Sequence, residues 1–257
     1  MALQLYDLAG ADAERRFSPY CWRSKMALRH KDLPFDTIPW RFREKNVIAF
    51  SGQGRVPVLC DGDRVVSDSW MIAGYLEDAY PDRPSLFRGD GGRVVTRFVN
   101  AWADSVLAGG ILRLVITDIF AHLDPKDRAY FRQTREQRLG ATLEAISSDR
   151  DVNVTALRKT LEPIRAVLAA QPYLGGEMPT YADYVVFGCF QWARCISAFS
   201  CLRTIRSGLG ATDYCRRSMD LPARRLVILY DACERTTQSF LAIINSPACD
   251  LRRQPCA

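Results

Sequence analysis

Residues 56–69 read VPVLCDGDRVVSDS and contain the strongest structural signals of this 257-residue chain. Two short apolar runs, Val56–Cys60 and Arg64–Ser67, flank an Asp61-Gly62 pair. That pair predicts a β-hairpin, because Asp-Gly suits the tight turn that joins two antiparallel strands. The stretch ends in Asp68-Ser69, a pair whose side chains accept hydrogen bonds from the free amides at a helix start. It therefore predicts two paired strands followed by a capped helix.

The residues before the hairpin alternate between strand and helix patterns. A proline at position 19 suits the first turn of a helix, and the helix capped by Asp68-Ser69 reaches about Tyr80. Residues 1–82 are therefore predicted to form an α/β domain with the element order β-α-β-α-β-β-α. The elements predicted upstream of the hairpin are strands at Leu3–Leu8 and Phe35–Trp40, a helix at Trp22–Lys31 and a short helix at Glu44–Phe50.

A connection rich in helix breakers follows at residues 83–92 and is predicted to be a linker. Beyond it the apolar residues recur with the 3.6-residue period of helices, so residues 93–198 are predicted to form an all-α domain. Residues 199–257 hold five of the nine cysteines and three Arg-Arg pairs, and they form an atypical tail with room for one helix at Leu221–Ile244. The helices predicted in the second domain are Val94–Phe120, Pro125–Ser148, Val154–Ala170 and Tyr181–Ala198.

The composition is that of an ordinary globular protein, with 48% hydrophobic and 25% charged residues. The net charge of +6 is modest and no basic stripe carries interleaved aromatic residues, so no nucleic-acid partner is expected. We see no apolar run of about 18–20 residues, so no membrane span is expected either. The start, MALQLYD, does not resemble a secretory signal, and the number of cysteines is odd. Both features predict reduced thiols in a cytoplasmic protein.

Neither a metal centre nor a dinucleotide site is expected. The chain has only two histidines, His30 and His122, and no Cys-x-x-Cys pair, which argues against zinc. No acidic residue stands at a triad-like spacing from either histidine, so neither is given a role. Gly52-Gln53-Gly54 fails as a dinucleotide fingerprint, because Pro57 occupies the position of the final glycine.

Ser18 is the predicted centre of the chemistry. It opens the sequence SPYC, residues 18–21, between a polar loop and the first predicted helix. A side chain at a helix N-terminus meets free amides and the positive end of the helix dipole, which together stabilise an anion such as a thiolate. The structural alternative is that Ser18 only caps the helix.

Two further features favour a peptide-like ligand. Val56-Pro57 at a strand start suits a cis peptide bond, which would turn the backbone of Val56 outward to pair with an extended peptide. Asp68-Ser69 can hold an α-amino-acid group, with Asp68 on the ammonium and Ser69 and backbone amides on the carboxylate. Taken alone, these features are an edge-strand proline and a good helix cap.

In this order and on this pattern of elements, the three features resemble the glutathione transferase superfamily. SPYC stands at the active-site turn of its thioredoxin-like N-terminal domain, Val56-Pro57 at its cis-proline and Asp68-Ser69 at its E/D-S motif. Thr180-Tyr181-Ala182-Asp183 resembles the capping box of its all-helical C-terminal domain. The segments FSPYCWR and DSWMIAGYLEDAYPDRP look most like the bacterial β-etherases and the fungal ligninolytic, serine-type transferases.

The resemblance implies an enzyme that uses glutathione as co-substrate and needs no metal. Ser18 matches the family's catalytic Ser or Cys, so its hydroxyl would donate to the glutathione sulfur. The thiolate would then attack a hydrophobic, aromatic electrophile, with β-aryl ether cleavage as the sharper version. Val56, Pro57, Asp68 and Ser69 match the glutathione-binding motifs.

Other site residues follow from the same resemblance. The glycine carboxylate of glutathione would be held by Arg41, Lys45 or Gln53, among which the sequence does not choose. Tyr20, Trp22 and Trp102 are candidate walls of the cleft for the second substrate, and core packing is the alternative for Trp102. The residues near Trp102 that would share this wall are Ala101, Ser105 and Val106. The resemblance also implies a homodimer.

Two other functions stay open at the level of sequence. A non-catalytic protein of the same fold would bind glutathione or hydrophobic ligands without turnover. A thiol reductase would use Cys21, although serine at position 18 breaks the Cys-x-x-Cys redox pair.

Overall fold

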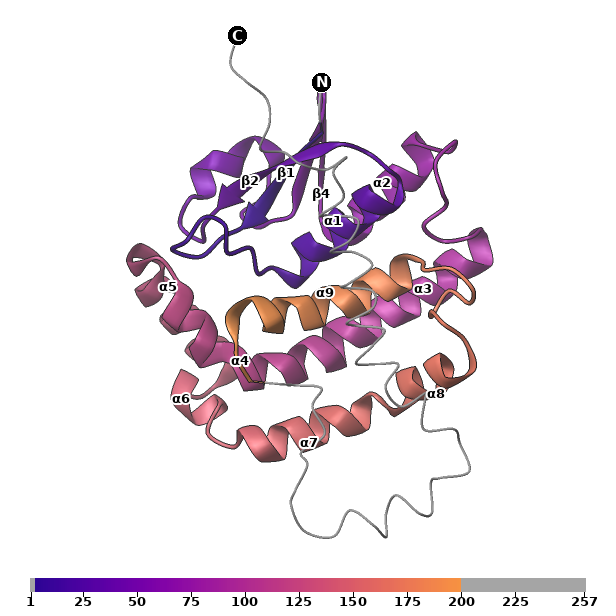
Figure 1. Ribbon diagram of the computed structural model, residues 1–257. Helices are drawn as coiled ribbons and strands as arrows, with labels where there is room; N and C mark the ends of the chain where they lie inside the picture. Colours follow the sequence, from indigo (N-terminus) through magenta and orange to yellow (C-terminus); the bar gives the residue numbers. More distant parts are fainter. Residues whose placement is uncertain (1–2, 200–257) are drawn as a thin grey trace, which may run out of the picture.

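The first domain is a four-stranded sheet with two helices and a 3₁₀ helix. The computed structural model describes residues 3–199 of the chain (Figure 1). β1 runs parallel to β2 and antiparallel to β3, and β3 pairs with β4 through the predicted hairpin, which gives the sheet order β2-β1-β3-β4. This is the thioredoxin-like arrangement that the sequence predicts. The strands are β1 (Leu3–Leu8), β2 (Phe35–Trp40), β3 (Val58–Asp61) and β4 (Arg64–Ser67).

The helices of this domain start where the sequence places their caps. α1 (Pro19–His30) begins after Ser18, and α2 (Ser69–Ala79) begins after Asp68. The short helix predicted at Glu44–Phe50 is a 3₁₀ helix, η1 (Lys45–Ser51). Each cap side chain accepts hydrogen bonds from the first turn of its helix, which satisfies amides that have no partner within the helix.

The second domain is all-helical and is built around one central helix. α9 packs on α4 of its own domain and on α1 of the first domain, so it forms the boundary with the first domain (Figure 1). Its predicted capping box is confirmed, with Thr180 and Asp183 bonded reciprocally. The helices are α3 (Asp90–Trp102), α4 (Ala108–His122), α5 (Pro125–Leu139), α6 (Leu143–Ile146), α7 (Arg150–Thr160), α8 (Glu162–Ala170) and α9 (Tyr181–Ile196).

Several predicted helix boundaries are wrong. α1 begins at Pro19 and not at the predicted Trp22, and α7 begins at Arg150 and not at the predicted Val154. The helix expected at 125–148 breaks at Gly140, where a φ of +73° suits glycine and ends α5. The helix expected at 154–170 breaks at Leu161, just before Pro163 in the first turn of α8. α3 begins at Asp90, inside the predicted linker, because an acidic side chain suits the first turn of a helix. The predicted helix at Leu221–Ile244 lies outside the described residues.

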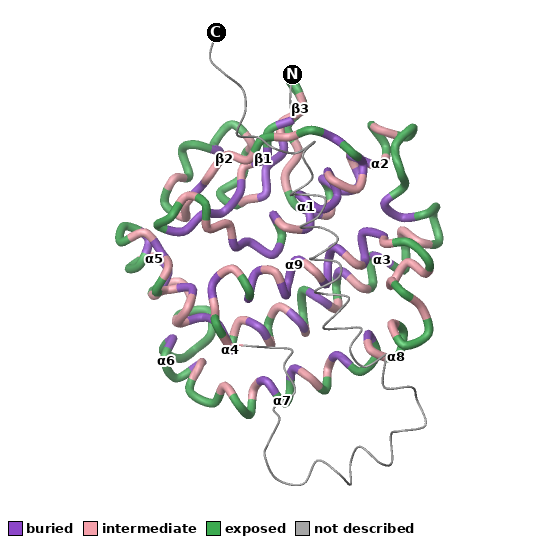
Figure 2. Tube along the Cα trace, in the orientation of Figure 1, coloured by how far each residue is buried: buried purple, intermediate pink, exposed green. Residues whose placement is uncertain are grey.

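α3 and α4 form one continuous helix through a π-helical turn, η2 (Ala103–Leu107). This 33-residue helix, Asp90–His122, is long and apolar enough to meet the length and hydropathy criteria of a membrane span, and this corrects our reading of the sequence. The charged residues Asp104, Arg113 and Asp118 interrupt its apolar residues, so the sequence shows no uninterrupted apolar run of that length. By the same criteria, core helices of water-soluble domains also qualify, and the buried face of α4 packs on α9 and α7. Figure 2 shows buried positions recurring along α4 and α9.

Candidate active site

Ser18 lies at the N-cap of α1 with an extended backbone (φ −76°, ψ 125°). Its Oγ accepts a hydrogen bond of 3.2 Å from the amide of Cys21, and only 4% of the residue is exposed. Because Oγ acts as acceptor in this bond, the hydroxyl proton is still available for donation. Capping the helix and donating to an anion are therefore compatible roles for one side chain.

Cys21 lies in the first turn of α1 and is fully buried. Its Sγ lies 3.9 Å from the carbonyl oxygen of Tyr6. Burial raises the pKa of the Cys21 thiol well above its usual range, and the negative charge of Asp7 raises it further. A thiol in this environment stays protonated and is a poor nucleophile.

The second and third motifs of the sequence are joined by a hydrogen bond. The Val56–Pro57 peptide bond is cis, as predicted, and the amide of Asp68 donates to the carbonyl oxygen of Pro57 at 3.3 Å. Asp68 has a positive φ of 75°, which is uncommon for a residue other than glycine. The segment before β3 and the start of α2 therefore form one edge of the first domain.

The Asp68 carboxylate uses only one of its oxygens to cap α2. Oδ1 accepts from the amides of Trp70 at 2.9 Å and Met71 at 3.2 Å, and no partner of Oδ2 is found among residues 3–199. Asp68 is exposed, whereas Ser69 is 2% exposed. The carbonyl oxygen of Ser69 accepts a hydrogen bond of 2.7 Å from the hydroxyl of Tyr181 on α9.

The three candidates for a carboxylate contact differ in their existing bonds. The Arg41 guanidinium donates to the carbonyl of Gly10 at 3.0 Å and lies within 4 Å of two carboxylates, those of Glu44 and Asp124. Gln53 and Lys45 are exposed, and Lys45 Nζ lies 5.3 Å from the ring centre of Tyr130. Arg41 is thus already used to join the first domain to the start of α5.

Tyr20 and Trp22 lie on the first two turns of α1. Tyr20 is 37% exposed, and the guanidinium of Arg23 lies 4.7 Å from its ring centre. Trp22 is half-buried, its Nε1 donates to the carbonyl of Arg16 at 3.0 Å, and its ring packs edge-on against Phe187. Of the two, Tyr20 offers more of its surface to a ligand.

Trp102 ends α3 and is half-buried against the core. Part of its side chain packs in the core and part is accessible, so Trp102 can serve both in packing and as a wall of the substrate cleft. Of its predicted neighbours in the wall, Ala101 and Ser105 are exposed and Val106 is half-buried.

Several polar residues at the domain junction were missed by sequence reasoning. Asp127 of α5 is 2% exposed and accepts from the amides of Phe42 at 3.0 Å and Arg43 at 3.1 Å in the other domain. Arg23 pairs with Asp104 at 2.8 Å. The one sequence feature that could have revealed them is a charged residue inside an apolar helical pattern, such as Asp104, because a buried charge needs a partner.

Within the part of the chain that the structure describes, no three His, Cys, Asp or Glu side chains gather into a metal site. The cysteines in this part, which have no disulfide partners, are Cys21, Cys60, Cys189 and Cys195.

Comparison with known proteins identifies both domains. The glutathione S-transferase N-terminal domain matches residues 13–84, and the glutathione S-transferase C-terminal domain matches residues 95–204. Glutathione S-transferase Z2 of Arabidopsis thaliana is 31% identical over 173 residues, which cover 63% of this chain and 69% of the relative. The probable glutathione S-transferase GSTU6 of Oryza sativa subsp. japonica is 25% identical over 184 residues, 68% of each chain.

Solved structures agree with this assignment. Glutathione transferase GSTFuA3 from Phanerochaete chrysosporium aligns with a TM-score of 0.74 and 26% identity over 94% of this chain and 97% of its own. The glutathione S-transferase CsGST63524 of Ceriporiopsis subvermispora, crystallised with glutathione, aligns with a TM-score of 0.69 and 22% identity over 91% of this chain and 98% of its own, and shows the same fold. With both domains matched and the two-domain fold in common, the chain belongs to the glutathione S-transferase family of enzymes.

Proposed function

We propose that this chain conjugates glutathione, through its sulfur, to hydrophobic, aromatic electrophiles, with Ser18 as the catalytic residue that stabilises the thiolate. The observation that carries the proposal is the bond from the Cys21 amide to Ser18 Oγ. It holds the hydroxyl at the start of α1 and uses Oγ only as an acceptor, so the hydroxyl can donate its proton to the sulfur of glutathione. The thiolate then attacks the electrophilic carbon, a C–S bond forms, and the leaving group departs with its electron pair.

The energetics of this arrangement are sufficient. A free thiol has a pKa of about 8.5, and lowering it by about two units requires roughly 2.7 kcal/mol of preferential thiolate stabilisation. A hydrogen bond to a charged group supplies about 1.5–3 kcal/mol and a helix N-terminus about 0.3–2 kcal/mol. Together these two contributions account for the shift without a general base.

Glutathione would extend along the edge made by the cis-proline segment and α2. The backbone N–H and C=O of Val56, placed by Pro57, would pair with the cysteinyl residue. The γ-glutamyl group would lie at the start of α2, with its ammonium on Asp68 Oδ2 and its carboxylate on Ser69 and nearby amides. Support comes from the open Asp68 oxygen and from the fungal relatives crystallised with glutathione.

Gln53 is our choice for the glycine carboxylate. It is exposed, and its side chain makes no hydrogen bond within residues 3–199, whereas the guanidinium of Arg41 is bonded to Gly10, Glu44 and Asp124. Tyr20, Trp22 and Trp102 would face the second substrate, and Tyr20 has a larger exposed fraction than Trp22.

As the more specific substrate we propose a β-aryl ether. The thiolate would attack the carbon that carries the ether oxygen, and the aryloxide would leave and become a phenol after taking up a proton. Support comes from the similarity of this chain to fungal transferases of known structure. Release of a phenol from a model aryl ether, followed against the glutathione consumed, measures this activity directly.

Two substitutions of Ser18 test its role. Ser18→Ala removes the donor and should lower kcat/KM toward chlorodinitrobenzene by about 10–1000-fold, the range lost with one stabilising donor. It also removes the helix cap, which costs about 0.5–2 kcal/mol of stability. Ser18→Asp keeps a cap but has no proton to donate at neutral pH, so activity should fall while stability is retained.

The pKa of bound glutathione, measured by thiolate absorbance, is the decisive quantity. It should rise toward that of free glutathione in both variants. An unchanged thiol pKa and rate in Ser18→Ala would exclude the proposed role. Thermal stabilisation by glutathione without turnover of any electrophile would instead favour a non-catalytic binding protein.

A homodimer in the cytoplasm is the state we propose for the enzyme. The exposed apolar residues Met71 of α2 and Val94, Val95 and Phe98 of α3 form what we call the α2–α3 face. Single exposed apolar side chains are normal on a protein surface, but a continuous group of them marks an interaction site.

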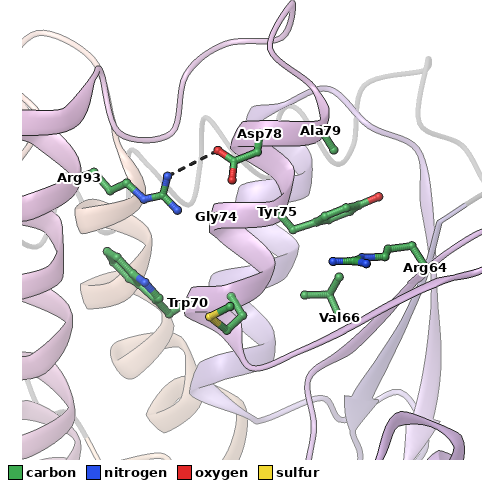
Figure 3. A pocket seen from close by; sticks show the side chains of 9 residues that line it. Arg64, Val66, Trp70, Gly74, Tyr75, Asp78, Ala79 and Arg93 are labelled. Atoms are coloured by element: carbon green, nitrogen blue, oxygen red, sulfur yellow. Dashed lines mark ion pairs between the residues drawn. The ribbon is translucent and has the colours of Figure 1, made fainter.

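A hollow of about 420 Å³ lies beside these residues (Figure 3). Arg93 of α3 forms a 3.5 Å ion pair with Asp78 of α2 on one side of the hollow, and Arg64 of β4 lies on the other. A two-fold axis brings a surface against its own copy, so a face with charges of both signs is complementary to itself. We therefore propose a second copy of this chain as the partner. The residues that line the hollow are Arg64, Val66, Trp70, Met71, Gly74, Tyr75, Asp78, Ala79 and Arg93.

A further inference from the structure

Arg23 is a fully buried cation at the junction of the two domains. It lies on α1, one turn beyond Ser18, and its side chain is 0% exposed. Its Nη2 lies 2.8 Å from Oδ1 of Asp104, which belongs to the π-helical turn between α3 and α4. Removing the carboxylate would leave the buried guanidinium without a compensating charge, which is strongly destabilising.

Asn100 completes a ring of hydrogen bonds with this pair. Arg23 Nη1 donates to Asn100 Oδ1 at 3.3 Å, and Asn100 Nδ2 donates to Asp104 Oδ2 at 2.8 Å. Both oxygens of the carboxylate are therefore occupied, and the orientation of Asp104 is determined by two neighbours. Arg23 Nη2 also lies 3.5 Å from the sulfur of Cys189 on α9.

The ring contacts Tyr20, the residue that we place in the substrate cleft. The guanidinium of Arg23 lies 4.7 Å from the centre of the Tyr20 ring, a distance typical of a cation–π contact. Tyr20 is two residues from Ser18 and 37% exposed, and Asp104 is the only charged member of the ring with an exposed side chain, at 36%. Burial raises the pKa of the Tyr20 hydroxyl, and the charge of Asp104 raises it further.

α9 closes the arrangement from the other side. A Cβ placed on Gly188 would lie 2.5 Å from the carbonyl oxygen of Pro19 and 3.1 Å from Cγ of Arg23, so α1 rests directly on the backbone of α9. The first turn of α1 thus has little freedom to move toward α9. Its remaining freedom, toward α3, is limited by Asp104 and Asn100.

We propose that Arg23 and Asp104 are a positioning pair that determines where Tyr20 stands in the substrate cleft. Neither residue touches the reacting atoms. The pair acts through Tyr20, which contacts the electrophile, and this inference rests on the proposed function. It should govern how productively the second substrate is aligned, because small misplacements of a positioning group lower rates by up to about 100-fold. Glutathione binds on a different edge and should be affected little.

Asp104→Asn is the primary test. It keeps the size of the side chain but removes the charge opposite Arg23, and because an amide has one oxygen where the carboxylate has two, it also loses one of the two hydrogen bonds that Asp104 accepts from Arg23 and Asn100. We expect kcat/KM toward chlorodinitrobenzene to fall about 10–100-fold, with the KM for glutathione within about twofold of the unchanged enzyme. Asn100→Ala leaves both charges in place and removes the hydrogen bonds of Asn100 to Arg23 and to Asp104, so it should give the same division of effects with a smaller loss.

A double-mutant cycle with Tyr20→Ala separates positioning from general stability. If Asp104 acts through Tyr20, Asp104→Asn should cause little further loss in the Tyr20→Ala background. Additive losses would overturn the inference, as would an equal rise in the KM for glutathione. If Asp104→Asn does not fold, the cycle of Asn100→Ala with Tyr20→Ala decides by the same criterion.

Asp118→Asn is the matched control. Asp118 of α4 pairs with Arg150 of α7 at 3.0 Å and has no contact with Tyr20. Its replacement should therefore lower stability without lowering kcat/KM toward chlorodinitrobenzene. An Asp104→Asn variant that behaves like this control would also overturn the inference. Failure of the unchanged chain to turn over glutathione would instead contradict the proposed function, so the two failures are distinguishable.

Discussion

The hydroxyl of Tyr181 donates a hydrogen bond of 2.7 Å to the carbonyl oxygen of Ser69, 112 positions away in the chain. Tyr181 opens α9 and Ser69 opens α2, and both residues are buried. Burial raises the pKa of the Tyr181 hydroxyl, so it remains a donor at all physiological pH values. The backbone at which we place the γ-glutamyl group is therefore held by the other domain.

Replacing Tyr181 by Phe should weaken this connection. The buried carbonyl of Ser69 loses its partner, so the free energy of unfolding should fall by about 1–3 kcal/mol. The KM for glutathione should rise more than that for the electrophile, because α2 is the affected element. Urea denaturation and steady-state kinetics measure both effects. Tyr173→Phe is the control, since no hydrogen bond of that hydroxyl is found within residues 3–199, and equal losses in the two variants would contradict the assignment.

Cys21 should be dispensable for catalysis. Its thiol is buried and its pKa is raised, so no thiolate is available for exchange chemistry. We expect Cys21→Ala to retain transferase activity within about threefold, which is small beside the loss expected for a catalytic donor. Alkylation followed by mass spectrometry should label the half-buried Cys60 before Cys21 in the native protein. Rapid labelling of Cys21, or activity lost with it, would favour the thiol reductase hypothesis.

His30 should make stability depend on pH. Its Nδ1 lies 2.6 Å from the hydroxyl of Tyr184 and its Nε2 3.1 Å from the carbonyl of Ser85, so it joins α1 to α9 and to the connection between domains. The neutral ring satisfies both bonds, with Nε2–H donating to Ser85 and Nδ1 accepting from Tyr184. Burial lowers its pKa in the folded protein.

The sign of the effect follows from that shift. The unfolded chain, with a histidine pKa of about 6.5, takes up the proton first, so acid favours unfolding. The contribution of neutral His30 is fully present above about pH 6.5 and is lost as the pH falls through the folded pKa. Urea denaturation between about pH 8 and pH 5 should show a shallower decline for His30→Gln. An equally steep decline in that variant would assign the effect to other groups.

Val94→Glu should disrupt the proposed homodimer. Val94 is 72% exposed on the α2–α3 face, and a carboxylate buried there without a partner opposes association. Light scattering coupled to size-exclusion chromatography should show a monomer. Val152→Glu is the matched control, because Val152 is 69% exposed on α7 and lies outside this face. A dimer that survives Val94→Glu, or a wild-type monomer, would contradict the proposed interface.

Much of the first domain could be predicted because its signals are local. Asp61-Gly62 has a turn preference of its own, and Ser18 and Asp68 cap helices that begin at the next residue. In the second domain the helical period was correctly recognised, but the breaks at Gly140 and Leu161 were not. Helical patterns continue on both sides of each break, so periodicity alone did not locate them.

The sequence alone determined which elements form in the first domain and where the family motifs stand, because turns, caps and the proline bond depend on neighbouring residues. Only the tertiary structure decided that Arg41 is bonded to α5, that Arg23 is neutralised by Asp104, and that Tyr181 reaches Ser69. The partner of a buried polar group is whichever group folding brings within about 3 Å. When the two residues are far apart in the chain, no local sequence pattern predicts that contact.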